Sequence, residues 1–210
     1  MTRTHPQLAI DGIVFDFDGV LVNSEPLHLR SAQDALATRG LTVDPGEYYD
    51  RYVGYDDVGM FVHYAQDHGI ALDTCALSEL LAAKAMRFAE LEASDTVLVQ
   101  GAAECVRRMA DVAPLAIASG ARRDEIERML GRVGLARYFP TIVAAGETAF
   151  GKPAPDPYAR AAELLGSAPA RTLAIEDTAA GLASARTAGL ICIGVTTTFP
   201  VSKLQAAHRR

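Results

Sequence analysis

The chain reads IDGIVFDFDGVL over residues 10–21, and this stretch decides the fold. A short apolar run, Ile10–Phe15, is followed by two aspartates, Asp16 and Asp18, and then by a glycine. Short apolar runs bounded by polar or glycine residues are typical of strands buried on both faces of a parallel sheet. The stretch therefore predicts a buried strand that places two carboxylates at its carboxyl end.

Four similar apolar runs follow, and we predict a parallel strand for each: Pro114–Ala118, Thr141–Ala145, Arg171–Ile175 and Leu190–Val195. Helical patterns that end near a glycine lie between the later runs, at Ala121–Val133, Pro155–Leu165 and Thr178–Thr187, with Gly134, Gly166 and Gly189 behind them. Alternating strands and helices predict an α/β fold, with a doubly wound parallel sheet covered by helices on both faces.

The first strand departs from this rhythm because a long segment separates Asp16 from the second strand at Pro114. The segment has apolar residues at helical spacing, and Asp44–Glu47 resembles a capping box with proline at the first helical position. The apolar positions are Leu27, Ala32, Ala35, Leu36, Val58, Phe61, Val62, Ala65, Leu77, Leu80, Leu81, Phe88 and Leu91. We expect an all-helical cap over residues 25–98, inserted into an α/β core of residues 1–24 and 99–210.

The composition limits the classes of molecule that this protein is expected to bind. The chain has 210 residues with 20 Lys and Arg against 26 Asp and Glu, and this acidic balance argues against binding nucleic acid through its phosphates. The three cysteines are odd in number and widely spaced, which suits a reducing compartment. With no signal-peptide or membrane-spanning pattern in sight, we expect a cytoplasmic monomer without a membrane partner.

Polar residues follow four of the five predicted strands. In an open α/β sheet, ligands bind beyond the carboxyl ends of the strands, so these residues belong to one candidate site. They are Asp16 and Asp18, Ser119 and Gly120, Lys152, and Glu176 and Asp177. Each alone has a plain alternative, such as a solvated acidic turn, a helix cap or a surface lysine. Their accumulation at one edge favours a functional site.

The chemistry of this edge suits a phosphate and a divalent cation. Carboxylates from Asp16 and Asp177, with a backbone carbonyl, are ligands that Mg²⁺ accepts while bridging to a substrate phosphate. Lys152 and the donors at Ser119 and Gly120 would add local positive potential, which an acidic protein needs in order to bind an anion.

These motifs resemble, in order and spacing, the four motifs of the haloacid dehalogenase superfamily. The resemblance covers nearly the whole chain, and it points to the subgroup of phosphoglycolate phosphatases, sugar-phosphate phosphatases and β-phosphoglucomutase. It implies that Asp16 attacks phosphorus to form an aspartyl-phosphate, while Asp18 protonates the leaving alcohol and later deprotonates water. The second aspartate of motif one argues for phosphoryl transfer over cleavage of a carbon–halogen bond.

The resemblance also implies the remaining roles at this edge. Ser119, Gly120 and Lys152 would hold the phosphoryl oxygens. Mg²⁺ would be held by Asp16, Asp177 and the Asp18 carbonyl, with Glu176 binding directly or through an intermediary.

Substrate choice is expected in the cap, where four residues are candidates. His28 resembles a linker histidine near the acid/base aspartate, although a solvated hinge histidine is an equal alternative. Lys84 lies on an apolar helical stripe and either points toward substrate, as in mutase-like relatives, or extends its amine to water. Near Tyr55 and Asp57, β-phosphoglucomutase has an arginine for the second phosphate of its substrate, and an acid there should repel such a group.

We therefore predict a Mg²⁺-dependent phosphatase for a small phosphorylated metabolite, such as a sugar or polyol phosphate or a phosphoglycolate-like compound. The first alternative is a phosphohexomutase, in which the phosphoryl group returns to a bound intermediate. The second is a non-catalytic protein that binds phosphorylated metabolites. A receiver domain fits poorly, because a long helical insertion follows the first strand.

Overall fold

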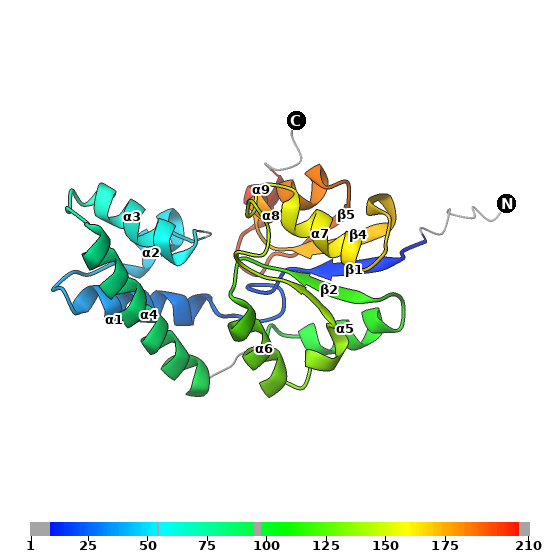
Figure 1. The fold of residues 1–210 in the computed structure, drawn as a ribbon, viewed down its shortest axis with the longest axis horizontal. Coiled ribbons are helices and arrows are strands. Elements are labelled where there is room, and N and C mark those ends of the chain that lie inside the picture. Colours follow the sequence, from blue (N-terminus) through cyan, green and yellow to red (C-terminus); the bar gives the residue numbers. More distant parts are fainter. Residues whose placement is uncertain (1–8, 54, 95–97, 206–210) are drawn as a thin grey trace. The chain divides into compact units, whose positions relative to one another are not determined.

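The computed structural model describes residues 9–53, 55–94 and 98–205. The chain divides into two compact units, one formed by Met1–Asn23 with Leu98–Arg210 and the other by Ser24–Val97 (Figure 1). The helical unit is thus a single insertion in the chain of the other unit.

The first unit contains a five-stranded parallel sheet with strand order β3-β2-β1-β4-β5. Its strands are β1 (Gly12–Phe15), β2 (Leu115–Ala118), β3 (Thr141–Val143), β4 (Thr172–Glu176) and β5 (Ile191–Gly194). The central β1 is buried along its whole length, and its Val14 pairs with Ala116 on one side and Ala174 on the other. The predicted α/β parallel sheet is confirmed, with β4 displaced by one residue from the expected Arg171–Ile175, so that it includes Glu176.

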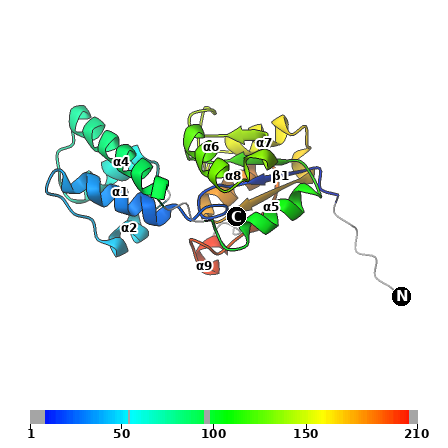
Figure 2. The same cartoon turned by 90° about the horizontal axis from the view of Figure 1, so that it is seen from below.

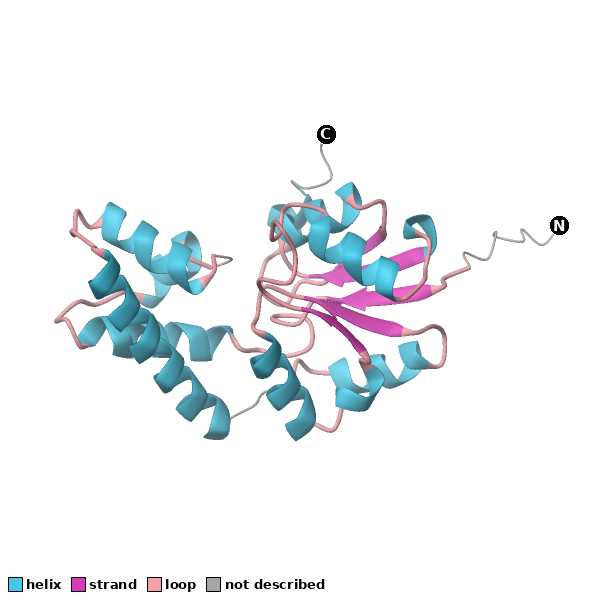
Figure 3. Cartoon of the chain, in the orientation of Figure 1, coloured by secondary structure: helices cyan, strands magenta, loops and turns pink. Residues whose placement is uncertain are grey.

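Helices flank this sheet (Figure 3). They are α5 (Ala102–Ala110), α6 (Arg123–Arg132), α7 (Asp156–Leu164), α8 (Ala179–Thr187) and α9 (Val201–Gln205), with short 3-10 turns at Ala136–Tyr138 and Pro169–Arg171. Tyr158 and Ala161 of α7 and Ala185 of α8 pack in one buried cluster with Val14 and Ala116 of the strands. In Figure 1, α7 and α8 lie on one face of the sheet and α5 and α6 on the other. The sequence pattern did not single out α5 or α9.

The second unit carries four helices among its described residues: α1 (Glu25–Ala37), α2 (Pro45–Arg51), α3 (Asp57–Asp67) and α4 (Thr74–Ser94). Its buried cluster includes Leu36, Tyr52, Phe61, Tyr64 and Leu80, and α1 and α4 lie side by side (Figure 2). These side chains come from the apolar positions that predicted the helices, apart from the tyrosines.

The capping box expected at Asp44–Glu47 is only half formed. The Asp44 carboxylate accepts from the Gly46 amide at 2.7 Å and caps α2. The Glu47 carboxylate instead accepts from the Tyr52 hydroxyl at 2.9 Å and lies 2.7 Å from His68 Nε2. Glu47 therefore ties α2 to the end of α3.

Over the residues that the structure describes, no helix combines the length and the apolar character needed to cross a bilayer. Because all five strands run parallel, their carboxyl ends meet at one edge of the sheet, and the candidate residues follow those ends.

Candidate active site

A lysine whose side chain is 14% exposed joins two carboxylates at the carboxyl edge of the sheet. Asp16 follows β1 directly and is only 6% exposed. Lys152, from the loop between β3 and α7, places its Nζ 2.7 Å from Asp16 Oδ1 and 2.6 Å from Glu176 Oε1. Charge-assisted contacts of this length, with little exposure to water, fix the lysine between β1 and β4.

Glu176 and Asp177 differ in how far their oxygens are already engaged. The second Glu176 oxygen, Oε2, accepts from the amide of Thr178 at 2.7 Å and from its hydroxyl at 2.9 Å. Asp177 is 1% exposed, and its Oδ1 is among the buried oxygens without a hydrogen-bond partner in the described part of the chain. An orphaned buried carboxylate oxygen is costly unless something else binds it, so Asp177 has a free ligand position that Glu176 lacks.

Thr178, rather than Asp177, caps α8. The Thr178 hydroxyl accepts from the Gly181 amide at 3.0 Å, which is the N-cap bond of this helix. Asp177 is therefore not the cap of α8, and its carboxylate remains available to the site.

The charges at this edge do not balance. Burial raises the pKa of Asp16 well above its usual range; the Lys152 ammonium opposes this shift, and the charges of Glu176 and Asp177 add to it. Burial and then the charge of Glu176 raise the pKa of Asp177 to about 7. Burial alone would lower the pKa of Lys152, but Asp16 and Glu176 raise it above its usual value. Three buried carboxylates share one ammonium, and the site lacks positive charge.

Ser119 and Gly120 lie in the turn after β2. Ser119 is 4% exposed, and its Oγ accepts from the Ala121 amide at 3.0 Å, which leaves the hydroxyl hydrogen to donate elsewhere. The helix behind them begins only at Arg123, so these two residues precede α6 rather than forming its first turn. The hydrogen-bond donors that they offer to a ligand are therefore the Ser119 hydroxyl and the Gly120 amide, both in a turn.

Gly19 brings the turn after β1 against Asp177. Its φ is +74°, a conformation that favours glycine, and a Cβ there would overlap the Asp177 carboxylate and the Thr198 hydroxyl. Asp18, beside it, is half-buried, and its charge contributes to the raised pKa of Asp16. The tight turn is what brings the Asp-x-Asp segment close to the end of β4.

The donor set fits a hard divalent cation. One carboxylate oxygen from each of Asp16, Glu176 and Asp177 lies within 4.8 Å of the other two, although Lys152 and Thr178 already engage both oxygens of Glu176. Mg²⁺ prefers oxygen ligands and binds through one or two carboxylates. The unpartnered Asp177 oxygen and the excess of negative charge are the observations that support such a site.

The helical unit brings three of its four candidates together. Lys84 of α4 is buried, and its Nζ contacts Asp57 Oδ1 at 2.5 Å and lies 3.1 Å from His28 Nδ1. The His28 ring stacks on Phe88, with 4.4 Å between ring centroids. Tyr55 is not part of this cluster, because it is half exposed and stacks on His63. The buried Lys84 therefore does not extend to water but pairs with the half-exposed carboxylate of Asp57.

Sequence reasoning missed Tyr158 beneath the lysine. Tyr158 of α7 is fully buried, and its ring lies 4.9 Å from Lys152 Nζ. A ring face at this distance attracts an ammonium. The sequence could have predicted this contact, because Tyr158 lies on the buried face of a helix that begins four residues after Lys152.

The family is shown by comparison with known proteins. The family model for haloacid dehalogenase-like hydrolases matches residues 10–189, and the chain belongs to this family. Its relatives include the protein CbbY of Rhodobacter capsulatus, 32% identical over 87% of this chain and 84% of that protein. Another is the validoxylamine A 7'-phosphate phosphatase of Streptomyces hygroscopicus subsp. limoneus, 31% identical over 92% of this chain and 89% of the relative.

Among solved structures, a variant of CbbY from Rhodobacter sphaeroides in complex with xylulose-(1,5)bisphosphate superposes with a TM-score of 0.83. It is 27% identical, and the match covers 95% of this chain and 92% of that one. With phosphatases among its relatives, the chain is a hydrolase of the phosphoric monoester class. The predicted family and enzyme class are confirmed.

Proposed function

We propose that this chain is a Mg²⁺-dependent phosphatase that hydrolyses a small sugar or polyol phosphate, or a phosphoglycolate-like compound, through an aspartyl-phosphate. The carrying observation is the buried Asp16 carboxylate, held by Lys152 at the carboxyl edge of the sheet. A carboxylate fixed in this way, away from competing water, is placed to act as a nucleophile.

The residues divide the two half-reactions between them. A carboxylate oxygen of Asp16 attacks phosphorus as the bond from phosphorus to the alcohol oxygen breaks, and Asp18 gives that oxygen a proton. Asp18 then takes a proton from water, the water oxygen attacks phosphorus, and the bond to Asp16 breaks, which releases phosphate and restores both carboxyl groups. Ser119, Gly120 and Lys152 donate to the phosphoryl oxygens throughout.

Asp16, Asp177 and the backbone carbonyl of Asp18 would hold the metal ion. When bound, Mg²⁺ supplies positive charge close to the phosphoryl oxygens. Glu176 has both oxygens engaged, by Lys152 and Thr178, and its role is to orient the lysine beside the site.

Substrate choice is proposed to lie in the helical unit, at His28, Asp57 and Lys84. The Lys84 ammonium is already neutralised by Asp57, so this cluster offers little free positive charge for a second phosphate. It suits the hydroxyl groups of a monophosphate, and this favours a phosphatase over a phosphohexomutase that handles bisphosphates. Tyr55 stays a weaker candidate.

Phosphate release from a panel of monophosphates, with Mg²⁺ or with EDTA, tests this function. Asp16→Asn should lower kcat by at least about 10³-fold, because the nucleophile is removed. Asp11→Asn is the matched control, since Asp11 lies before the same strand and pairs with Arg171 at 2.6 Å. Unchanged turnover in Asp16→Asn would refute the mechanism. Conversion of glucose 1-phosphate to glucose 6-phosphate faster than phosphate release would favour the mutase.

A further inference from the structure

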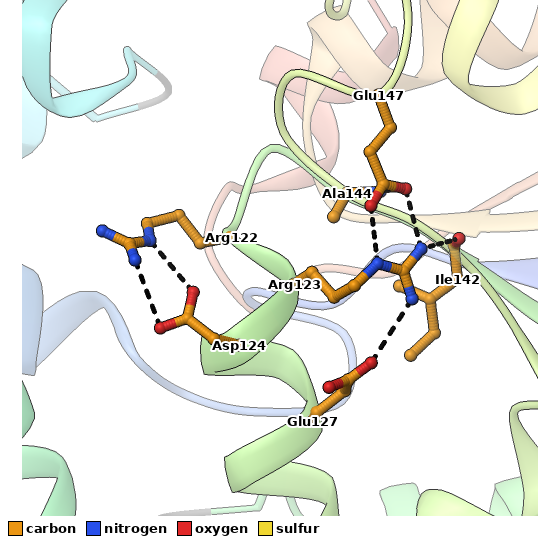
Figure 4. A network of polar contacts seen from close by, with 7 residues as sticks. All are labelled: Arg122, Arg123, Asp124, Glu127, Ile142, Ala144 and Glu147. Atoms are coloured by element: carbon orange, nitrogen blue, oxygen red, sulfur yellow. Dashed lines mark hydrogen bonds and ion pairs between the residues drawn. The ribbon is translucent and has the colours of Figure 1, made fainter.

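Arg123, the first residue of α6, makes a network of contacts with the segment after β3 (Figure 4). Its Nε lies 2.6 Å from Glu147 Oε1 and its Nη2 lies 2.8 Å from Glu147 Oε2, a two-pronged pairing of guanidinium and carboxylate. The same Nη2 donates to the carbonyl of Ile142 in β3 at 2.8 Å. Glu147 Oε2 also accepts from the Ala144 amide at 3.0 Å. Bidentate pairs of this kind fix geometry as well as charge.

This pair connects the two loops that carry the phosphate-binding candidates. Arg123 comes shortly after Ser119 and Gly120, and Glu147 comes shortly before Lys152. The backbone joins the same two segments, because the Ser119 amide donates to the Val143 carbonyl at 2.9 Å.

A second backbone bond lies two residues further along each segment, where the Ala145 amide donates to the Ala121 carbonyl at 2.9 Å. The Arg123–Glu147 pair lies beyond these two bonds, at the point where the chain leaves β3 for the lysine loop. The pair adds a side-chain contact to the two backbone hydrogen bonds that already join the loops.

Of the two arginines at the start of α6, only Arg123 connects this segment to the segment after β3. Arg122 pairs with Asp124 at 3.0 Å, two residues away on the same segment, so that contact joins no separate parts of the chain (Figure 4). The side chains of Arg123 and Glu147 are 44% and 34% exposed, and pairs this exposed contribute little to overall stability. The hydrogen bonds from Arg123 lower the pKa of Glu147, so the pair stays charged at neutral pH.

We propose that Arg123 and Glu147 are positioning residues for phosphoryl binding: their pairing holds the Lys152 loop in register with the Ser119–Gly120 turn. The hydroxyl, the amide and the ammonium then converge on the same phosphoryl group. Neither residue contacts the reacting atoms. The inference rests on the proposed phosphatase function.

The test compares Arg123→Gln, Glu147→Gln, the double variant and Arg123→Lys, with Arg122→Gln as the matched control. Two quantities are measured in Mg²⁺ buffer: kcat/KM for a monophosphate and the dissociation constant of inorganic phosphate, by calorimetry. Each single variant should weaken phosphate binding and lower kcat/KM about tenfold, because small displacements of binding groups are costly. The double variant should be no worse than either single one, and Arg122→Gln should match the wild type.

Arg123→Lys keeps the charge but loses the forked geometry, so it should behave like Arg123→Gln. Wild-type phosphate affinity in both single variants overturns the proposal, as do additive losses in the double variant or full function in Arg123→Lys. If the wild-type protein binds phosphate but hydrolyses none of the panel, the proposed function fails, and the phosphate affinities of the variants still decide this inference.

Discussion

Gly181 lies in the first turn of α8, and a methyl group there would overlap the carboxylate of Glu176. Helix propensity alone predicts that Gly181→Ala is stabilising, since alanine favours helices by about 1 kcal/mol over glycine. The geometry predicts the opposite sign. Glu176 is fully buried and held by Lys152 and Thr178, so it has little room to move.

We expect Gly181→Ala to lower the free energy of unfolding by roughly 1–3 kcal/mol and to reduce kcat/KM. Gly131→Ala is the matched control, because Gly131 also lies in a helix and a Cβ there meets nothing within 4 Å. Denaturant unfolding of both variants measures the difference. Equal stabilisation by the two substitutions would contradict the tight contact with Glu176.

At the scale of single residues, Asp57 is the position that sets the charge of the helical unit's polar cluster. Asp57→Asn leaves the buried Lys84 without its ion-pair partner. We expect kcat/KM for a hexose bisphosphate, relative to the monophosphate, to rise about tenfold, because an unneutralised ammonium attracts the second phosphate. Asp50→Asn removes the same charge from an exposed site in α2 and should leave this ratio unchanged. The same ratio in both variants would remove Asp57 from substrate choice.

At the scale of elements, α1 and α4 meet where His28 faces Lys84. Burial and then the Lys84 charge lower the pKa of His28 from 6.5 to about 3, while Asp57 opposes the shift. The unfolded chain therefore takes up this proton first. The stabilising effect of a neutral His28 is complete above pH 6.5 and is lost as the pH falls toward 3.

NMR titration of the imidazole should show no protonation of His28 between pH 5 and 8. Lys84→Met should raise its pKa toward the usual value by removing a neighbouring positive charge. A His28 signal that titrates near 6.5 in the wild-type protein would show that Lys84 does not control it.

At the scale of the whole molecule, metal binding should raise the free energy of unfolding. A ligand at 100 times its dissociation constant stabilises the folded state by about 2.7 kcal/mol. For a chain of this size that corresponds to a rise in Tm of about 5–10 °C. We expect such a rise when Mg²⁺ replaces EDTA, and its loss in Asp177→Asn, with Asp11→Asn as the control. An undiminished shift in Asp177→Asn would place the metal elsewhere.

The sheet and the members of its carboxyl edge could be predicted from sequence because their signals are local. Apolar runs of five or six residues mark the strands, and parallel strands bring the residues that follow them to one edge. The helix α5 was predictable from the same kind of local signal, because its apolar residues Ala102, Cys105, Val106 and Met109 recur at helical spacing between charged residues.

The contacts between distant side chains could not be predicted. Arg123 contacts Glu127 of its own helix at 3.4 Å, as a local rule predicts, but nothing in the sequence selects Glu147, 24 positions away. Likewise, the pairing of Lys84 with Asp57 depends on how α3 packs on α4. Such partners are chosen by tertiary packing, which brings together charges that no local pattern relates.

The base of the helical insertion has a consequence for how such a protein diversifies. Val22 and Leu98 form an antiparallel bridge, and the Val99 amide donates to the Leu21 carbonyl at 3.0 Å. The two ends of the inserted segment are thus fastened together by the sheet-bearing unit itself, whatever lies between them. Contacts within the sheet-bearing unit compensate for the entropy lost when the two ends of the inserted segment are brought together. The length and sequence of the insertion can therefore vary without disturbing the strands. If substrate preference lies in the insertion, as proposed above, the insertion can change while the residues at the carboxyl edge of the sheet stay as they are.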